Sequence, residues 1–242
     1  MLLKTRGIVL KAIKYSETSV IVDIYTEAKG LQSYIVSGVR SKKPKAVAGY
    51  LQVTSLVDMV VYFQENVKKL FRTKEIKAAY NYTSLPFDVK KGTIGIFIAE
   101  VIKKTIFESE ENPSMFRFFF DTYVFIDRTK QPVVNIHLYF LVAYTHHLGF
   151  YPQIDIRKEY RFFDMVNGVF LKERPNHLYF FDEKMTNILR QLLSIEMQDC
   201  HLVTITGKDR NTFLDKMLGY YNYHIDSFAG IKSHEILRAV FG

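Results

Sequence analysis

The spacing of apolar residues changes near Tyr80 of this 242-residue chain, and that change limits the folds open to it. Before residue 80 apolar residues recur at every second position, as in Val20, Val22 and Ile24. Such alternation is typical of a β-strand with one buried face. In residues 89–107 they recur every three or four positions, which is the spacing of a helix with one buried face. The chain therefore combines a β-rich first part with a helical second part.

Five short segments before residue 80 have the composition and spacing of strands. They are Leu3–Tyr15, Ser19–Tyr25, Leu31–Ser37, Leu51–Phe63 and Val67–Ile76. Gly30 ends the turn between the second and third segments, where a positive φ suits glycine. Five strands joined by short turns favour a small closed barrel, and the OB-fold is the five-stranded barrel of this size. We therefore predict an OB-fold over residues 1–80.

The rest of the chain is predicted to be mainly helical. The expected helices are Val89–Phe107, Ser114–Ile126, 131–148, Glu183–Glu196, Asp209–Tyr221 and Ser233–Phe241. Asn112 and Pro113 have the order of an N-cap followed by a first helical residue. Gly149 suits the end of the third helix.

One stretch within the helical part reads differently. Residues 154–181 lack helical spacing and contain Asn167-Gly168, a hairpin turn signal. We therefore predict an α+β chain, in which an OB-fold barrel at 1–80 precedes a mainly α-helical domain at 81–242 that carries a small β-hairpin insertion. The domain boundary is expected near Asn81–Asp88.

The positive charge lies entirely in the predicted barrel. The formal net charge is +8, and residues 1–80 hold 14 Lys and Arg against 6 Asp and Glu, whereas residues 81–242 hold 19 of each sign. A cluster of Lys and Arg replaces the counterions of a phosphate backbone, so this asymmetry indicates a polyanion-binding module. A solubilising surface is the alternative explanation.

Two groups of cations are the candidates for phosphate contacts. The loop Gly38–Lys45 carries Arg40, Lys42, Lys43 and Lys45, and the fifth strand carries Lys68, Lys69, Arg72 and Lys74. Alternation places Lys68, Arg72 and Lys74 on one side of that strand. We also expect Arg6, Lys11 and Lys14 of the first strand to border them. Such contacts carry no sequence information, so binding should be non-specific.

Three tyrosines of the predicted barrel are candidates for stacking on bases. They are Tyr25, Tyr34 and Tyr62, and each exposed ring would contribute about 1–3 kcal/mol per base. Packing inside the barrel is the alternative for all three.

Motifs that carry common catalytic chemistry are absent from the sequence. There is no P-loop, dinucleotide-binding glycine motif, Gly-x-Ser-x-Gly elbow or His-Glu-x-x-His. His146 and His147 are adjacent and point in different directions on a helix. Cys200 is the only cysteine, which excludes an intrachain disulfide or a Cys₄ zinc site. A chain without disulfides is typical of the reducing cytoplasm, where we expect this protein to act. Because the catalytic motifs are absent, we expect that it is not an enzyme. No apolar run approaches the length of a membrane span.

Several short motifs occur in an order that resembles one family. The N-terminal motifs are Arg6-Gly-Ile-Val-Leu-Lys11, Tyr15-Ser-Glu17, Val20–Thr26, Gly30 and Gly38-Val-Arg40. The later motifs are His147-Leu-Gly-Phe-Tyr-Pro152, Tyr221-x-x-His224 and Lys232-Ser233-x-x-Ile-Leu237. Together they cover essentially the whole chain and resemble the RecO family of bacterial DNA repair proteins.

The resemblance implies a recombination mediator without bond-making chemistry. Such a protein binds single- and double-stranded DNA, anneals complementary strands, pairs with RecR, contacts the acidic tail of single-stranded DNA-binding protein and helps to load RecA. For that tail, the helical part offers Phe and Tyr beside four cations, Arg117, Arg128, Lys130 and Arg190.

The chain departs from the family pattern in one place. Many members have a four-cysteine zinc knuckle after the Leu-Gly-Tyr-x-Pro segment, whereas residues 153–181 contain no cysteine here. We expect a degenerate, metal-free hairpin with Phe162, Phe163, Val169 and Phe170 as its apolar core, and no cofactor. Two rival functions remain, an OB-fold scaffold for RNA or protein without annealing activity and a hydrolase that uses carboxylates of the helical part.

Overall fold

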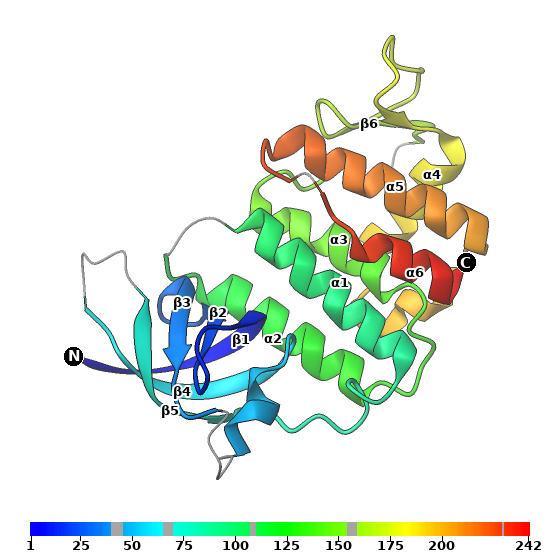
Figure 1. Ribbon diagram of the computed structural model, residues 1–242. Helices are drawn as coiled ribbons and strands as arrows, with labels where there is room; N and C mark the ends of the chain where they lie inside the picture. The colour runs from blue at the N-terminus through cyan, green and yellow to red at the C-terminus, as the bar shows by residue number, and fades with distance from the viewer. Residues whose placement is uncertain (40–45, 65–69, 107–109, 154–158, 229) are drawn as a thin grey trace. The chain divides into compact units, whose positions relative to one another are not determined.

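The computed structural model describes residues 1–39, 46–64, 70–106, 110–153, 159–228 and 230–242 (Figure 1). The chain divides into two compact units. The first contains Met1–Asp88 and Ala99–Arg128, and the second contains Val89–Ile98 and Thr129–Gly242. A helical segment therefore belongs to the same unit as the β-rich N-terminal part, which the sequence did not indicate.

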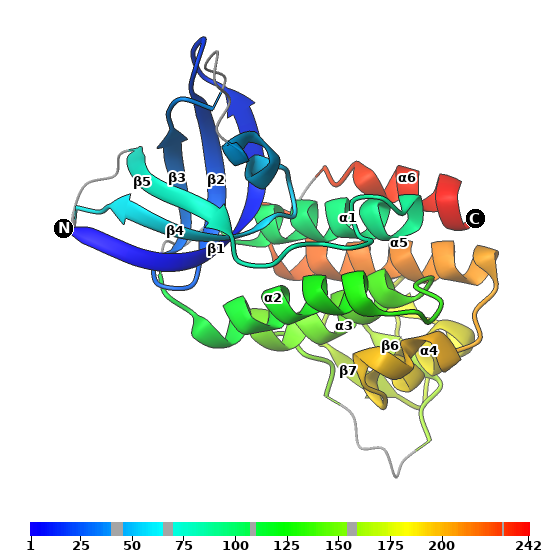
Figure 2. The same cartoon turned by 90° about the horizontal axis from the view of Figure 1, so that it is seen from below.

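Five strands form a closed barrel in the first unit. They are β1 (Leu2–Lys14), β2 (Val20–Thr26), β3 (Gly30–Val36), β4 (Leu56–Tyr62) and β5 (Phe71–Ala78). Their order around the barrel is β1-β2-β3-β5-β4, and β4 closes the barrel by pairing with β1. The long strand β1, which can be followed in Figure 2, pairs with β4 through its first half and with β2 through its second half. The predicted five-stranded OB-fold barrel is confirmed.

The start of the fourth predicted strand is wrong. Residues Ala46–Leu51 form a short 3₁₀ helix, η1, and β4 begins only at Leu56. Thr54 has a φ of 80°, which no strand accommodates, and its N–H donates to the carbonyl of Val9 at 2.8 Å. Leu51 is nevertheless buried in the barrel core, so its apolar character fits the alternating pattern that predicted a strand.

The barrel core consists of the inward side chains of all five strands. The buried members are Val9, Val22, Ile24, Tyr34, Val36, Val39, Leu51, Val57, Met59, Val61, Phe63 and Phe71. They alternate with outward residues along β2 and β4, as period two requires.

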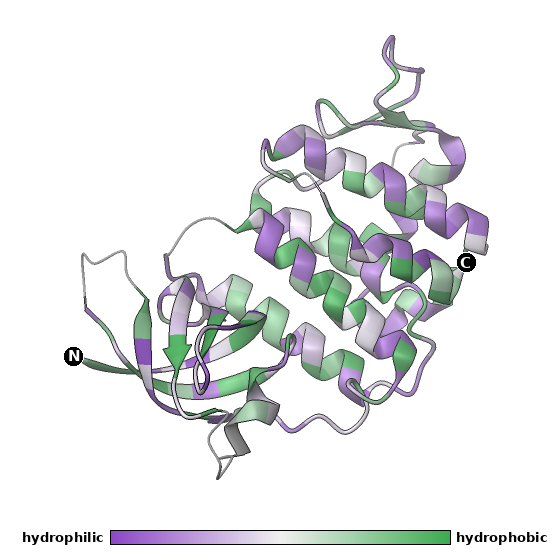
Figure 3. Ribbon diagram, viewed as in Figure 1, coloured by the Kyte–Doolittle hydropathy of each residue, from purple (hydrophilic) through white to green (hydrophobic). Residues whose placement is uncertain are grey.

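Two helices follow the barrel. They are α1 (Val89–Thr105), which spans both units, and α2 (Pro113–Arg128), which lies in the first unit. The Asn112 side chain accepts the Met115 N–H at 3.0 Å, so the predicted N-cap is confirmed. Figure 3 shows α1 as mostly hydrophobic, in agreement with the burial of Phe97, Val101 and Ile102.

The second unit contains the remaining helices and a small sheet. Its elements are α3 (Ile136–Leu148), β6 (Phe162–Asp164), β7 (Val169–Leu171), β8 (Phe180–Phe181), α4 (Glu183–Leu193), η2 (Met197–Leu202), α5 (Gly207–His224) and α6 (Ser233–Phe241). Helix α3 begins later than predicted, at Ile136, and the side chain of the preceding Asn135 donates to the carbonyls of Cys200 and Val203. Gly149 ends α3 with a φ of 83°, as expected.

The predicted hairpin is present in the second unit. β6 and β7 are antiparallel across the Asn167-Gly168 turn, where Gly168 has a φ of 66°, and β8 adds a third strand to β6. Asp164 accepts hydrogen bonds from the backbone and side chain of Asn167 and so braces the turn. Among the described residues, no helix is both long enough and apolar enough to span a membrane.

Candidate nucleic-acid interface

The outward face of β1, β4 and β5 brings exposed cations together. The registers align Arg6 with Asp58 and Lys77 in one row of this face, and Leu2 with Tyr62 and Arg72 in another. Between these rows, Lys4 faces Val60, which in turn faces Glu75. We call this surface the β1–β4–β5 face. Its exposed cations are Lys4, Arg72, Lys74 and Lys77.

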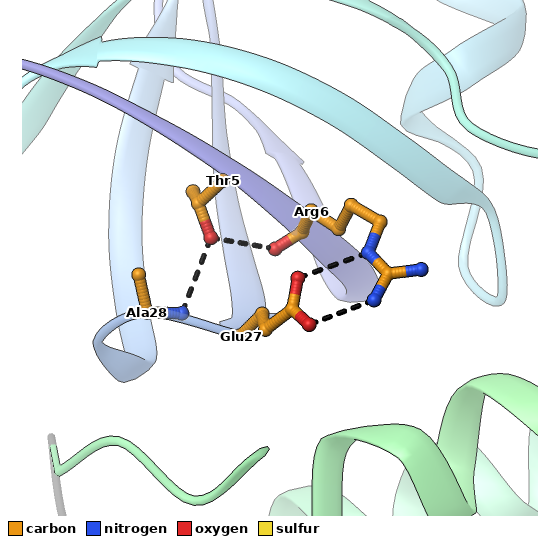
Figure 4. Close-up of polar contacts among 4 residues, drawn as sticks. All are labelled: Thr5, Arg6, Glu27 and Ala28. Atoms are coloured by element: carbon orange, nitrogen blue, oxygen red, sulfur yellow. Dashed lines mark hydrogen bonds and ion pairs between the residues drawn. The ribbon is translucent and has the colours of Figure 1, made fainter.

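Arg6 on this face has a close acidic partner. Arg6 forms a bidentate ion pair with Glu27, with distances of 2.9 and 2.7 Å (Figure 4). Its guanidinium also lies 5.4 and 5.0 Å from the ring centroids of Phe116 and Phe120 of α2. The hydrogen bond between Arg6 and Glu27 raises the pKa of Arg6 and lowers the pKa of Glu27. Arg6 thus fastens β1 to its neighbours, which makes it a poorer phosphate ligand than the sequence suggested.

The remaining cations of the face are held less tightly. Lys77 Nζ lies 4.0 Å from Asp58 Oδ2, and both side chains are largely exposed, so this pair is weak. Within the described ranges, no ion pair is found for Lys4, Arg72 or Lys74. These three side chains are therefore the best placed to meet a phosphate.

A cleft of about 920 Å³ lies on the β1–β4–β5 face. Its charged lining consists of four basic residues, Lys4, Arg6, Lys74 and Lys77, and three acidic ones, Glu27, Asp58 and Glu75. The cleft continues to Val36 and Ser37 at the end of β3. β3 and β5 pair only at Tyr34–Ile35 with Phe71–Arg72. The shortest ladder of the closed barrel therefore lies beside this cleft.

The outward side of β2 is closed, in contrast. Tyr25 lies there, 2% exposed, with its ring centroid 6.3 Å from that of Phe116 and 5.4 Å from that of Phe119. Lys103 Nζ also lies 3.1 Å from Asp23 Oδ2. OB-folds commonly bind oligonucleotides across strands two and three. In this unit, α2 and the end of α1 cover part of that surface.

The structure corrects two of the three predicted stacking residues. Tyr25 packs against α2, and burial raises its pKa to about 12. Tyr34 is fully buried in the barrel core. Neither ring can reach a base, because each is surrounded by protein. Tyr62 is 54% exposed on the β1–β4–β5 face and stays a stacking candidate.

The predicted neighbourhood of strands one and five is wrong. β4 lies between β1 and β5, so Arg6 approaches Lys77 only across Asp58. Lys11 and Lys14 lie on the half of β1 that pairs with β2, beyond its ladder with β4. They are exposed but do not belong to the β1–β4–β5 face.

A β-bulge also interrupts the alternation assumed for the fifth strand. Val61 pairs with Thr73, whereas the preceding Val60 pairs with Glu75, so Lys74 is the extra residue. Arg72 and Lys74 are both exposed. The predicted Arg40, Lys42, Lys43, Lys45, Lys68 and Lys69 lie outside the described residues, and their phosphate contacts stay predictions.

Two cations of the face were missed from the sequence. Lys4 precedes Arg6 by two positions, so strand alternation alone would have placed it on the same side. Lys77 was missed because the fifth strand was predicted to end at Ile76, whereas β5 continues to Ala78.

The hairpin of the second unit holds an aromatic core. Phe163 is fully buried, and its ring centroid lies 5.0 Å from that of Phe170 and 5.4 Å from that of Phe181. Phe162 and Val169, also predicted in this core, are only half-buried because they point to the other side of the sheet. The described part of the chain contains no group of three or more His, Cys, Asp or Glu arranged to hold a metal.

The cysteine does not have the surroundings of a nucleophile. Cys200 is 2% exposed, and burial raises its pKa to about 12, so its thiol stays protonated. The neighbouring His201 directs Nδ1 to the carbonyl of Gln198 at 2.9 Å.

Comparison with known proteins agrees with this architecture. Residues 1–82 match the family described as "Recombination protein O N terminal", and residues 86–234 match "Recombination protein O C terminal". Proteins named DNA repair protein RecO from Flavobacterium psychrophilum, Phocaeicola vulgatus and Bacteroides fragilis are 36%, 34% and 34% identical to the chain, and each alignment covers all of both sequences. The chain belongs to the RecO family of DNA repair and recombination proteins.

Proposed function

We propose that this protein is a cytoplasmic recombination mediator that binds single- and double-stranded DNA without sequence preference. It anneals complementary strands and helps to load RecA onto DNA coated with single-stranded DNA-binding protein, in partnership with RecR. It needs no bond-making chemistry for this, since it acts by holding strands and partners.

The open cationic β1–β4–β5 face is the observation that carries the proposal. Lys4, Arg72, Lys74 and Lys77 are exposed there beside a cleft of about 920 Å³, and Tyr62 adds an exposed ring. A positively charged groove with an aromatic side chain is the arrangement by which proteins bind single strands non-specifically. Family membership supports DNA as the polyanion, because the relatives are named DNA repair proteins.

A titration of single-stranded DNA at several salt concentrations tests the face. Four phosphate contacts predict that log K falls with log salt at a slope of about −2.8, at roughly 0.7 per contact on single strands. The double variant Lys4→Ala with Lys74→Ala should weaken binding and flatten the slope by about 1.4. The same variant should slow the annealing of complementary strands.

Lys14→Ala is the matched control, because Lys14 is an exposed cation of β1 that pairs with β2 and not β4. It should leave the affinity and the slope nearly unchanged. An equal loss with Lys14→Ala would move the site away from the β1–β4–β5 face. Tighter binding to RNA than to DNA, without annealing, would favour the RNA scaffold.

For the acidic tail of single-stranded DNA-binding protein, we propose a cluster in the second unit. The rings of Phe162 and Phe180 lie 5.7 Å apart and edge-on. Arg174 lies 5.1 Å from the Phe180 ring centroid, and Lys216 Nζ lies 5.8 Å from it. These residues line a pocket of about 390 Å³, which offers both cations and apolar surface. The four cations predicted from the sequence, Arg117, Arg128, Lys130 and Arg190, are not among the residues that line this pocket.

A peptide titration on the full-length protein tests this partner. Arg174→Ala should weaken binding of an acidic peptide with an apolar end. Lys172→Ala, which removes an exposed cation outside the pocket, should not. Equal binding by wild type and Arg174→Ala would place the tail elsewhere.

A further inference from the structure

A second cavity of the first unit lies where β4 begins and β5 ends. It has a volume of about 220 Å³, smaller than the roughly 300–1,000 Å³ of pockets for drug-sized ligands. Its lining includes three tyrosines and two amides, Tyr50, Tyr80, Tyr82, Gln52 and Asn81. We call this cavity the tyrosine pocket. Its size and aromatic lining suit one flat ring system.

Two of the tyrosine rings are held in place by their hydroxyls. The Tyr82 hydroxyl donates to the Thr54 carbonyl at 2.7 Å, and the Tyr80 hydroxyl donates to Asp127 Oδ2 at 3.0 Å. The two ring centroids lie 5.5 Å apart, with the rings inclined at 71°. Because both hydroxyls are bonded to protein, the rings are already oriented before any ligand arrives.

The floor of the pocket contains a strained residue. Thr54 lines it with a φ of 80°, an outlier for a β-branched side chain. Hydrogen bonds to Val9 and from Tyr82 hold Thr54 in this conformation. Strain of this kind persists where the surrounding structure enforces it, and it concentrates at binding sites.

The rim of the pocket is polar and carries a cation. Gln52 and Asn81 are exposed, and an amide both donates and accepts hydrogen bonds, so it can meet the edge of any base. The Arg128 guanidinium lies 5.4 Å from the Tyr80 ring centroid, and its Nε donates to the Tyr80 hydroxyl at 3.2 Å. The positive charge of Arg128 therefore lies next to the pocket lining, where it could pair with the phosphate of a bound nucleotide.

The tyrosine pocket and the cleft of the β1–β4–β5 face meet neighbouring positions of β5, although they share no lining residue. Lys77 lines the cleft of that face, and the next residue, Ala78, lines the pocket. We propose that the tyrosine pocket holds one unpaired nucleobase of a single strand whose backbone follows β5. This inference rests on the proposed DNA binding and adds a site that distinguishes an unpaired base from a paired one.

The test compares a 15-nucleotide thymidine strand with an abasic strand of the same length, both at fixed salt. The two probes share their phosphates and differ in their bases. Wild type should bind the thymidine strand roughly five- to 150-fold more tightly, the range expected for stacking of one base. Tyr80→Leu should remove at least fivefold of this preference while its affinity for the abasic strand stays unchanged.

Two further variants keep the result interpretable. Tyr80→Phe retains the ring and should keep the preference, even where loss of the bond to Asp127 lowers the melting temperature. Tyr15→Leu removes a 59% exposed ring outside the pocket and should have no effect. A strand carrying 5-iodouracil should crosslink, on irradiation of the wild type, to Tyr50, Tyr80 or Tyr82.

Each outcome has one meaning. Equal affinity of wild type for the two strands overturns the tyrosine pocket and leaves the β1–β4–β5 face intact. A preference that persists fully in Tyr80→Leu, with crosslinks only outside the pocket, also overturns it. Binding of neither strand by the wild type overturns both proposals.

Discussion

Asp127 offers a sharp test of how the first unit is held together. At the end of α2, its Oδ1 accepts the backbone N–H groups of Thr83, Ser84 and Leu85 at 3.0, 2.7 and 2.8 Å. Its Oδ2 accepts the hydroxyl of Tyr80 at 3.0 Å. Asp127 is only 2% exposed and Leu85 only 1%. One carboxylate thus fastens the segment that follows the barrel to a helix of the same unit.

The structure sets the expected cost of replacing this carboxylate. Asp127→Ala leaves three N–H donors without their acceptor; exposed Thr83 can turn to water, but buried Leu85 cannot. We expect a loss of about 2–4 kcal/mol in the free energy of unfolding, since a buried donor left without its acceptor costs about 1–3 kcal/mol and the bonds to a charged acceptor are lost as well. Asp127→Asn keeps an oxygen for the N–H groups and loses the negative charge. It should cost about 1–2 kcal/mol, the difference between charged and neutral hydrogen bonds.

Lowering the pH should reduce the difference in the free energy of unfolding between wild type and Asp127→Asn. Burial alone would raise the pKa of Asp127, but the hydrogen bonds from Leu85, Ser84 and Thr83 outweigh burial and lower that pKa below its ordinary value of 3.8. A carboxylate with a lowered pKa in the folded state stabilises above the unfolded pKa, and this stability is lost as pH falls towards the folded pKa. The advantage of wild type should therefore be complete at pH 7 and shrink below about pH 4.

Urea unfolding followed by tyrosine fluorescence measures these changes, since the chain has 16 Tyr and no Trp. Asp121→Ala, an exposed change on the same helix, is the control and should cost under about 0.5 kcal/mol. A cost below about 1 kcal/mol for Asp127→Ala would refute the reasoning, because it would mean that water replaces the carboxylate at all three donors.

Three other predictions follow from the turn, the basic loop and the hairpin. Gly30→Ala should destabilise the protein by about 2 kcal/mol or more in thermal unfolding, because Gly30 has a φ of 56° and an added Cβ would overlap the carbonyl oxygen of Glu110. The triple variant Lys42→Ala, Lys43→Ala and Lys45→Ala should keep the melting temperature while flattening the salt slope on single strands by about 2, and an unchanged slope would exclude the loop from binding. Chelation should leave the melting temperature unchanged, whereas elemental analysis that finds one zinc per chain would contradict the metal-free hairpin.

The barrel was predictable from the sequence because its period-two pattern is local. Val57, Met59 and Val61 alternate, and β4 buries all three. The pattern failed at Leu51, because a buried residue of a 3₁₀ turn has the same apolar character as a buried residue of a strand. The positive φ of Thr54 could not be predicted from the residue type, because threonine ordinarily favours strands.

The candidate site was only partly predictable, because strand order and coverage are not local. Alternation assigns Tyr25 and Tyr62 to outward faces, but it does not say what lies over each face. Phe116 and Phe119, about 90 residues farther along the chain, bury Tyr25 and leave Tyr62 in solvent. The placement of β4 between β1 and β5 likewise depends on how the barrel closes, and it separates Lys11 and Lys14 from the cations of β5.

Helix α2 covers the outward side of β2 and so limits which barrel surface is open to DNA. An OB-fold that presents strands two and three to a ligand needs the outward side of β2 open. Here Tyr25 on that side packs against α2, and Lys103 pairs with Asp23, so this side serves the cohesion of the first unit. The outward rows of β1, β4 and β5 keep their cations exposed, and the same strand β5 leads into the tyrosine pocket. Helix α2 therefore packs on the outward side of β2 and reaches Arg6 of β1, whereas Lys4, Arg72, Lys74 and Lys77 stay exposed, which is why the binding surface that we propose lies on β1, β4 and β5.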